Sequence, residues 1–174
     1  MFSLNNKKAV ITGGGSGIGQ AICVLFARQG AHVFVLELTE EAGRETRAMI
    51  TDEGGTAEII ACNVAIQQEV DRAFTSIGTV DILVNNAGIA HIGKADTTSE
   101  ADFDRVMSVN VKGVYNCIHA AIPRMREVGG GTILNMASIA ALVGIPDRFA
   151  YSTAKGAVKT MTMSVAKDYL ADHI

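Results

Sequence analysis

The stretch that decides the fold is TGGGSGIG, from Thr12 to Gly19, because it stands between two segments of different periodicity. Before it, KKAVIT (residues 7–12) is a short apolar run that ends at glycines, as a buried strand does. After it, GIGQAICVLFARQG (residues 17–30) has the spacing of an amphipathic helix that ends at a glycine. One face of this predicted helix carries four large apolar residues, namely Ile18, Ile22, Leu25 and Phe26. We therefore predict a strand, a tight turn and a helix in this order.

The same alternation of short apolar runs and helical segments continues along the chain. Further strands are expected at residues 32–38, 56–64, 80–88 and 130–138. Further helices are expected at residues 39–55, 66–78, 99–127 and 148–173, the third of which is either one long helix or a broken one. An all-helical fold is excluded, because the apolar runs are too short and are bounded by turn residues.

Strands and helices that alternate with short connections imply right-handed crossovers and a parallel sheet. The predicted strands are apolar throughout, which is typical of a sheet covered by helices on both faces. We therefore predict an α/β fold, a doubly wound parallel sheet in a Rossmann-type, three-layer sandwich. It would form a single domain over residues 1–174.

The composition is that of an ordinary globular protein, with 48% hydrophobic and 19% charged residues. The net charge is −3 and no long Lys/Arg run occurs, so nucleic acids and membranes are not expected partners. No apolar run approaches the roughly 18 residues of a membrane span. The four histidines lack ligand spacing, so no metal is expected. Three separated cysteines predict buried free thiols in a reducing cytoplasm: Cys23, Cys62 and Cys117.

The glycines of the turn indicate a ligand that approaches the backbone closely. Their spacing is Gly13-x3-Gly17-x-Gly19, which differs from the G-x-G-x-x-G fingerprint of dinucleotide-binding proteins. Glycine permits the sharp turn and leaves room beside it, and the following helix N-terminus offers free N–H groups to a pyrophosphate. A tight packing turn without a ligand is the alternative interpretation.

An acid at the end of the second predicted strand indicates which dinucleotide would be bound. Glu37 stands where a carboxylate accepts hydrogen bonds from the adenosine ribose hydroxyls. The same carboxylate would repel a 2′-phosphate, and neither Ser16 nor Leu38 supplies a cation for that phosphate. We therefore expect NAD as the cofactor in preference to NADP, unless Glu37 is only a solvated strand end.

Five motifs, in order along the whole chain, resemble those of the short-chain dehydrogenase/reductase (SDR) family. They are TGGGSGIG, NNAG (Asn85–Gly88), Asn110 in SVNVKG, Ser138 in NMASIA, and Tyr151 with Lys155 in YSTAK. The resemblance implies an oxidoreductase whose catalytic residues are Asn110, Ser138, Tyr151 and Lys155. The cofactor-binding residues would be Gly13, Ser16, Gly17, Ile18, Gly19, Glu37, Asn63, Val64, Asn86, Ala87, Gly88, Tyr151 and Lys155. In detail the chain is similar to NAD-dependent members that oxidise hydroxy acids or sugar acids.

The chemistry of such a site explains why a phenol and an ammonium lie four residues apart. In a helix, Tyr151 and Lys155 share one face. Free tyrosine has a pKa of about 10, but a neighbouring ammonium favours the phenolate and lowers that pKa, which suits an acid/base catalyst. The resemblance implies that Lys155 also holds the nicotinamide ribose, that Ser138 hydrogen-bonds the substrate oxygen and that Asn110 supports a water-mediated proton path. A turn cap at Ser138, a turn former at Asn110 and a solvated tyrosine and lysine are the structural alternatives.

Candidate substrate contacts surround this pair. Besides Ser138 and Tyr151, Arg148 could clamp a substrate carboxylate, which would favour a small hydroxy acid or sugar acid. A surface arginine that pairs with its neighbour or with solvent is an equal alternative. His91 and Lys94, in the segment after NNAG, are weaker candidates for the same pocket.

Two departures from the family pattern bear on function. Asn63 stands where an aspartate is usual, so we expect slightly altered adenine contacts. The family also continues with a sixth strand, a loop that touches the nicotinamide, a helical lid and a seventh strand. We therefore expect a domain truncated at its C-terminus, without the last two strands, in which the fifth strand is an exposed edge. Residues 99–127 and 150–172 are where the family forms homodimers or homotetramers.

Three functions remain open from the sequence. The first is hydride transfer between NAD(H) and a secondary alcohol or ketone, which includes hydroxy acids and sugar acids. The second is an NADPH-dependent 3-oxoacyl reductase, against which Glu37 argues. The third is a truncated, non-catalytic nucleotide-binding module.

Overall fold

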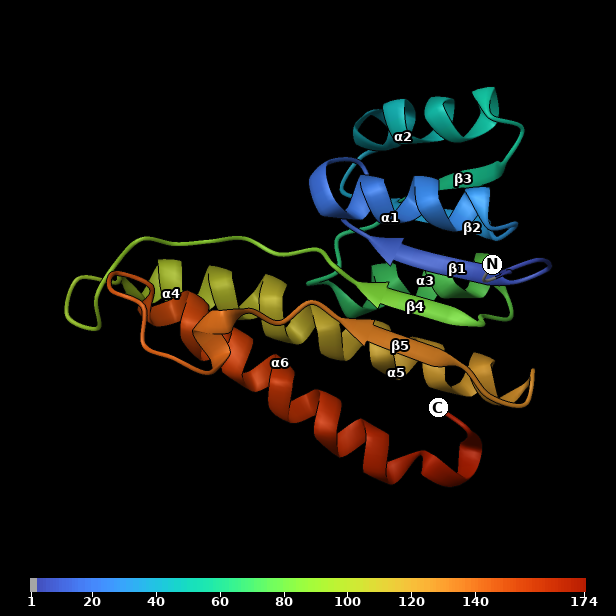
Figure 1. The fold of residues 1–174 in the computed structure, drawn as a ribbon. Coiled ribbons are helices and arrows are strands. Elements are labelled where there is room, and N and C mark those ends of the chain that lie inside the picture. Colours follow the sequence, from blue (N-terminus) through green and yellow to red (C-terminus); the bar gives the residue numbers. More distant parts are fainter. Residues whose placement is uncertain (1–2) are drawn as a thin grey trace.

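The computed structural model describes residues 3–174, in which strands and helices alternate from β1 to α6 (Figure 1). The strands are β1 (Lys8–Thr12), β2 (His32–Glu37), β3 (Thr56–Ala61), β4 (Ile82–Asn85) and β5 (Thr132–Asn135). The α-helices are α1 (Gly17–Arg28), α2 (Glu40–Asp52), α3 (Gln67–Ile77), α4 (Glu100–Met107), α5 (Gly113–Arg126) and α6 (Phe149–Asp168). A π-helical turn, Ser108–Lys112, joins α4 to α5, so the predicted helix over 99–127 is a broken one.

The five strands form one parallel sheet in the order β3-β2-β1-β4-β5. This order reverses direction between β1 and β4, which is the position where doubly wound sheets bind ligands beyond the carboxyl ends of the strands. The predicted doubly wound, Rossmann-type fold is therefore confirmed. Among the described strands, β3 and β5 lie at the two edges.

Two hydrophobic cores, one on each face of the sheet, hold the three layers together. The core under α1 and α2 contains Ala9 and Ile11 of β1, whereas the core under α3, α5 and α6 contains Val10 and Phe74. Alternate residues of a strand point to opposite faces, so a strand buried on both faces must be apolar at every position. This holds for the inner strands, but the edge strands β3 and β5 are only partly buried. Helices therefore cover the inner strands on both faces and cover the two edge strands less completely.

Helix α1 packs only part of its predicted apolar face, namely Ile22 and Phe26, against the core. Ile18 and Leu25 are 62% and 53% exposed, whereas the helix buries Gly19, Cys23, Val24 and Ala27. Small buried residues let the helix backbone lie close to the strands, and this close approach leaves Ile18 free at the carboxyl edge of the sheet. Among the described residues, no helix combines the length and the apolar composition that a membrane crossing requires.

Candidate active site

The glycine-rich turn connects β1 to α1 at the carboxyl edge of the sheet. Gly17 has a φ of +53°, which L side chains rarely adopt, and nothing lies within 4 Å of the position that a Cβ would take there. At Gly19 a Cβ would lie only 2.1 Å from the carbonyl oxygen of Gly13. The turn therefore needs glycine at Gly17 for its conformation and at Gly19 for its packing. The open space beside Gly17 leaves the N-terminus of α1 accessible to an anion.

The end of β4 is joined to this turn by side-chain hydrogen bonds. Thr12 Oγ1 accepts hydrogen bonds from the backbone N–H groups of Asn86 and Ala87, each at 3.0 Å. Asn86 Nδ2 donates to the carbonyl oxygens of Thr12 and Gly13, also at 3.0 Å. The NNAG segment and the glycine turn are therefore one rigid unit at the point where the strand order reverses.

A cleft of about 430 Å³ lies along this edge of the sheet. Its lining includes nearly all the predicted cofactor-binding residues: Gly13, Ser16, Gly17, Ile18, Glu37, Asn63, Val64, Asn86, Ala87 and Gly88. Gly19 lies behind the turn and not in the lining. The lining combines the glycines of the turn with a carboxylate beside them, which is the combination that dinucleotide-binding sites use for the pyrophosphate and the adenosine ribose.

Glu37 is tied to the glycine turn as well as to its own strand end. Its Oε1 accepts a hydrogen bond from the backbone N–H of Gly15 at 2.9 Å, and its Oε2 accepts one from Leu38 at 3.3 Å. These bonds hold the carboxylate at the cleft. Sequence reasoning predicted that Glu37 ends the second strand, and β2 does end there.

Asn63 lines the cleft, and its side-chain amide makes a hydrogen bond to the backbone of a neighbouring residue. Its Oδ1 accepts a hydrogen bond from the backbone N–H of Ala65 at 3.0 Å, and its own N–H donates to Glu69 Oε2 at 2.8 Å. One lone pair of this oxygen is thus used within the chain. The second lone pair of Oδ1 and the Nδ2 group remain available to a ligand in the cleft.

Tyr151 and Lys155 lie in a second cavity of about 250 Å³ that continues the cleft. The two hollows share Ile18, Asn86, Gly88 and Ile89 in their linings. A ligand that lies along the glycine turn would therefore reach the tyrosine and the lysine. The structure brings together the glycine turn, the NNAG segment and the YSTAK segment, as the motifs predicted.

Lys155 is buried at 6% exposure, with its ammonium directed at the end of β5. Lys155 Nζ donates to the carbonyl oxygen of Met136 at 2.5 Å and lies 5.7 Å from the centre of the Tyr151 ring. Burial lowers the pKa of the Lys155 ammonium. The α6 helix thus places a partly desolvated cation beside the phenol ring.

Asn110 lies in the π-helical turn and is 1% exposed. Its Oδ1 accepts a hydrogen bond from the N–H of Ile89, and its Nδ2 donates to the Ile89 carbonyl, both at 2.8 Å. A Cβ at Gly88 would lie 3.4 Å from Asn110 Oδ1 and 3.7 Å from Lys155 Nζ. Asn110 therefore fixes the backbone that separates the cleft from Lys155.

The remaining predicted residues lie around the second cavity without lining it. Ser138 caps the short 3₁₀ turn Ile139–Ala141, accepting a hydrogen bond from Ala140 N at 3.2 Å. Its hydroxyl proton stays available to a ligand. The Arg148 guanidinium donates to the carbonyl oxygen of Asp147 at 3.0 Å, as in the alternative of a surface arginine paired with its neighbour.

His91 and Lys94 belong to the segment between β4 and α4. His91 Nδ1 lies 3.7 Å from Asp102 Oδ1, and Lys94 is exposed. Neither is brought to the cavity of Tyr151 and Lys155. The backbone at Gly93 pairs with that at Arg148, so this segment is joined to the start of α6.

Some residues of the site were missed by sequence reasoning. Met136 follows β5 directly, and its position at a carboxyl strand end is the signal that could have found it. Thr46 of α2 and Gln20 of α1 contact the glycine turn from behind, and no spacing in the sequence indicates this. The three cysteines are buried free thiols, as predicted.

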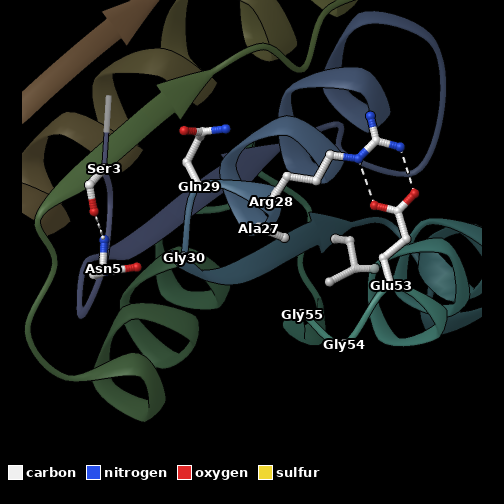
Figure 2. A pocket seen from close by; sticks show the side chains of 10 residues that line it. Ser3, Asn5, Ala27, Arg28, Gln29, Gly30, Glu53, Gly54 and Gly55 are labelled. Atoms are coloured by element: carbon white, nitrogen blue, oxygen red, sulfur yellow. Dashed lines mark hydrogen bonds and ion pairs between the residues drawn. The ribbon is translucent and has the colours of Figure 1, made fainter. Parts of the chain in front are cut away.

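A separate hollow of about 400 Å³ lies at the opposite end of the sheet, beside the ends of α1 and α2 (Figure 2). Figure 2 shows Arg28 and Glu53 pointing toward each other across it, and Arg28 Nε donates to Glu53 Oε2 at 2.6 Å. No predicted site residue lines this hollow. The residues predicted to bind cofactor and substrate therefore lie away from this hollow.

Comparisons with known proteins agree with this geometry. The sequence model of the family described as short chain dehydrogenase matches residues 7–174. An uncharacterized oxidoreductase of Thermotoga maritima is 44% identical over 97% of this chain and 68% of its own length. The 2-(S)-hydroxypropyl-CoM dehydrogenase 3 of Xanthobacter autotrophicus is 41% identical over 95% of this chain and 67% of its own length. The crystal structure of a gluconate 5-dehydrogenase from Burkholderia cenocepacia, in complex with NADP and tartrate, matches with a TM-score of 0.94 and 32% identity over 99% of this chain and 69% of that one.

The chain therefore belongs to the short-chain dehydrogenase family, whose members are oxidoreductases that use nicotinamide cofactors. It spans about two thirds of the length of the relatives that it matches. The family predicted from the five motifs is thus confirmed.

Proposed function

We propose that the chain transfers a hydride between NAD(H) and a secondary alcohol or ketone. The observation that carries the proposal is the continuity of two cavities, one along the glycine turn and Glu37 and the other at Tyr151 and Lys155. Bound dinucleotide would supply the hydride acceptor or donor. The residues of the chain would bind it and handle the proton of the substrate oxygen.

In the proposed reaction, Tyr151 takes the proton of the alcohol during oxidation and returns it during reduction. The Lys155 ammonium lies near the phenol and would stabilise negative charge that develops on it during this step, and Ser138 can donate its hydroxyl proton to the substrate oxygen. Asn110 holds the Ile89 peptide between the two cavities. Hydroxy acids and sugar acids belong to this proposal as secondary alcohols, and a clamp of their carboxylate by Arg148 would be an additional contact.

The preference for NAD over NADP rests on Glu37. Its carboxylate is held at the cleft by Gly15 and Leu38, where it can accept ribose hydroxyls and would repel a 2′-phosphate. The gluconate 5-dehydrogenase was crystallised with NADP, so a protein of this fold can also bind the phosphorylated cofactor. For this chain the carboxylate favours NAD.

We also propose a homodimer or homotetramer, since α5 and α6 expose Tyr115, Met163 and other apolar side chains. The three buried free thiols support a reducing cytoplasmic environment.

A non-catalytic nucleotide-binding module is the less favoured function. It would not explain why Tyr151 and Lys155 lie in a cavity that continues the cleft.

The test is the substitution Tyr151→Phe. We expect NADH binding, followed by nucleotide fluorescence, to stay near the wild-type level, and turnover of a panel of secondary alcohols to fall by at least about 100-fold. NADPH titrated in parallel should bind more weakly than NADH. Equal turnover by wild type and variant would refute the proton-transfer role, and tighter NADPH binding would refute the assignment of Glu37.

A further inference from the structure

The glycine turn is held from behind by two side chains that belong to none of the motifs. Thr46 Oγ1 donates to the carbonyl oxygen of Gly14 at 2.9 Å, and Gln20 Nε2 donates to that of Gly15 at 3.3 Å. Asn86 holds the two preceding carbonyls of the turn. Four consecutive carbonyl groups, from Thr12 to Gly15, are therefore engaged by donors of the protein.

Thr46 connects these contacts through a single hydroxyl group. It lies on α2 with 0% exposure, and its oxygen accepts a hydrogen bond from Gln20 Nε2 at 3.1 Å while its proton goes to Gly14. A hydroxyl has one proton and two lone pairs, so both bonds can form at once. Thr46 thereby fixes the glutamine amide as well as the turn.

The direction of these carbonyls decides where the N–H groups of the turn point. In a trans peptide the C=O and the N–H point in opposite directions. The carbonyl of Gly15 is held by Gln20, so the N–H of Ser16 in the same peptide points the other way, and Ser16 lines the cleft. The Gly14–Gly15 peptide is held at both ends, by Thr46 at its oxygen and by Glu37 at its N–H.

We infer that Thr46 and Gln20 are positioning residues that make the turn an anion site. They keep carbonyl oxygens away from a bound pyrophosphate and leave N–H groups and the α1 N-terminus facing it. Without them, a rotated peptide would direct a carbonyl at the anion, and affinity would fall. The inference rests on the proposed dinucleotide site and concerns only how the turn is held.

The experiment compares Thr46→Val with Thr46→Ser. Valine has the shape of threonine without the hydroxyl, whereas serine keeps the hydroxyl and both hydrogen bonds. We expect Thr46→Val to weaken ADP-ribose and NADH binding about tenfold, and Thr46→Ser to stay within about twofold of wild type. Adenosine, which lacks the pyrophosphate, should bind all three chains alike by NMR titration. Gln20→Met should resemble Thr46→Val.

Urea unfolding of each variant separates positioning from stability, since binding is measured where every chain is folded. Equal ADP-ribose affinity in the valine and serine variants would overturn the inference, and so would an equal loss for adenosine and ADP-ribose. A wild-type chain that bound neither nucleotide would refute the proposed function itself. In that case the inference is tested by hydrogen exchange of the Gly15 and Ser16 amides in the ligand-free chain. Exchange should be faster in Thr46→Val than in wild type, and an unchanged rate would overturn the inference.

Discussion

Lys155 carries a charge at a place where burial favours a neutral side chain. It is desolvated beneath the end of β5, and burial lowers the pKa of its ammonium. In the proposed function, the same charge would stabilise negative charge that develops on Tyr151 during proton transfer. A pKa shifted by burial, next to a second titratable group, is a feature of many functional sites.

This conflict predicts a pH dependence of stability. Because the pKa of Lys155 is lower in the folded chain, the unfolded chain binds more protons between the folded pKa and about 10.4, the usual value for lysine. The free energy of unfolding of wild type should therefore rise across this window relative to Lys155→Met, which has no charge to lose. Urea unfolding at a series of pH values measures the difference.

Lys159→Met supplies the matched control, since Lys159 is exposed on the same helix. Its stability difference from wild type should stay flat over the same pH range. A flat difference for Lys155→Met as well would show that burial does not disfavour the ammonium.

At the residue scale, the motifs predicted most of the site and missed what lies behind it. Tyr151, Lys155 and Glu37 could be named as candidates because their chemistry and their strand or helix positions are visible in the sequence. Thr46 was not found, because its contact with the turn depends on how α2 packs against α1. The predicted role of Arg148 stays a prediction, because the guanidinium is seen only with the carbonyl of Asp147.

At the scale of elements, the space around each helix determines where a glycine can be replaced by a larger residue. Gly113 begins α5 directly against the cleft wall, where a Cβ would lie 2.7 Å from Val64 Cγ2. Gly156 lies inside α6 with nothing within 4 Å of its Cβ position. The same substitution at the two glycines should therefore have opposite signs.

Gly156→Ala should raise the free energy of unfolding by about 0.5–1 kcal/mol, because alanine loses less backbone entropy in a helix. Gly113→Ala should lower it by about 1–3 kcal/mol, because the added methyl group must displace Val64. Urea denaturation of both variants gives the two values. Stabilisation by Gly113→Ala would mean that the α5–Val64 contact is looser than the structure shows.

The elements themselves were predicted well and their faces less well. Apolar periodicity placed every strand and helix, yet the strands proved shorter than expected, since turn residues such as Ala87 are also apolar. For α1, the large residues suggested one buried face, but only part of that face packs against the core, and Ile18 and Leu25 are exposed. Periodicity cannot distinguish a buried stripe from apolar residues that line a cleft, as Ile18 does.

At the scale of the whole molecule, the alternation of elements predicted a parallel sheet, whereas the order of its strands is known only from the structure. The polar segments after β1, β2 and β4 come together because all parallel strands end at one edge. That arrangement gathers residues from Gly13 to Lys155 around one crevice. The same order leaves β5 as an edge strand with no partner on its outer side among the described residues.

The outer side of β5 offers unpaired backbone groups and no charge. Thr132 and Met136 donate their N–H groups toward β4, so those of Ile133 and Asn135 point to the free side. Leu134 is 46% exposed on this strand. An uncharged, apolar edge strand is a template for pairing with another chain.

Leu134→Lys should therefore reduce concentration-dependent association of this chain, because an edge lysine disfavours pairing and keeps its aliphatic stem on the surface. The free energy of unfolding should change by no more than about 1 kcal/mol. Leu25→Lys, on the equally exposed surface of α1, controls for general hydrophobicity and should leave association unchanged. Sedimentation velocity over a range of concentrations measures the association of both variants. An equal loss of association in the two variants would assign it to apolar surface in general and not to the edge of the sheet.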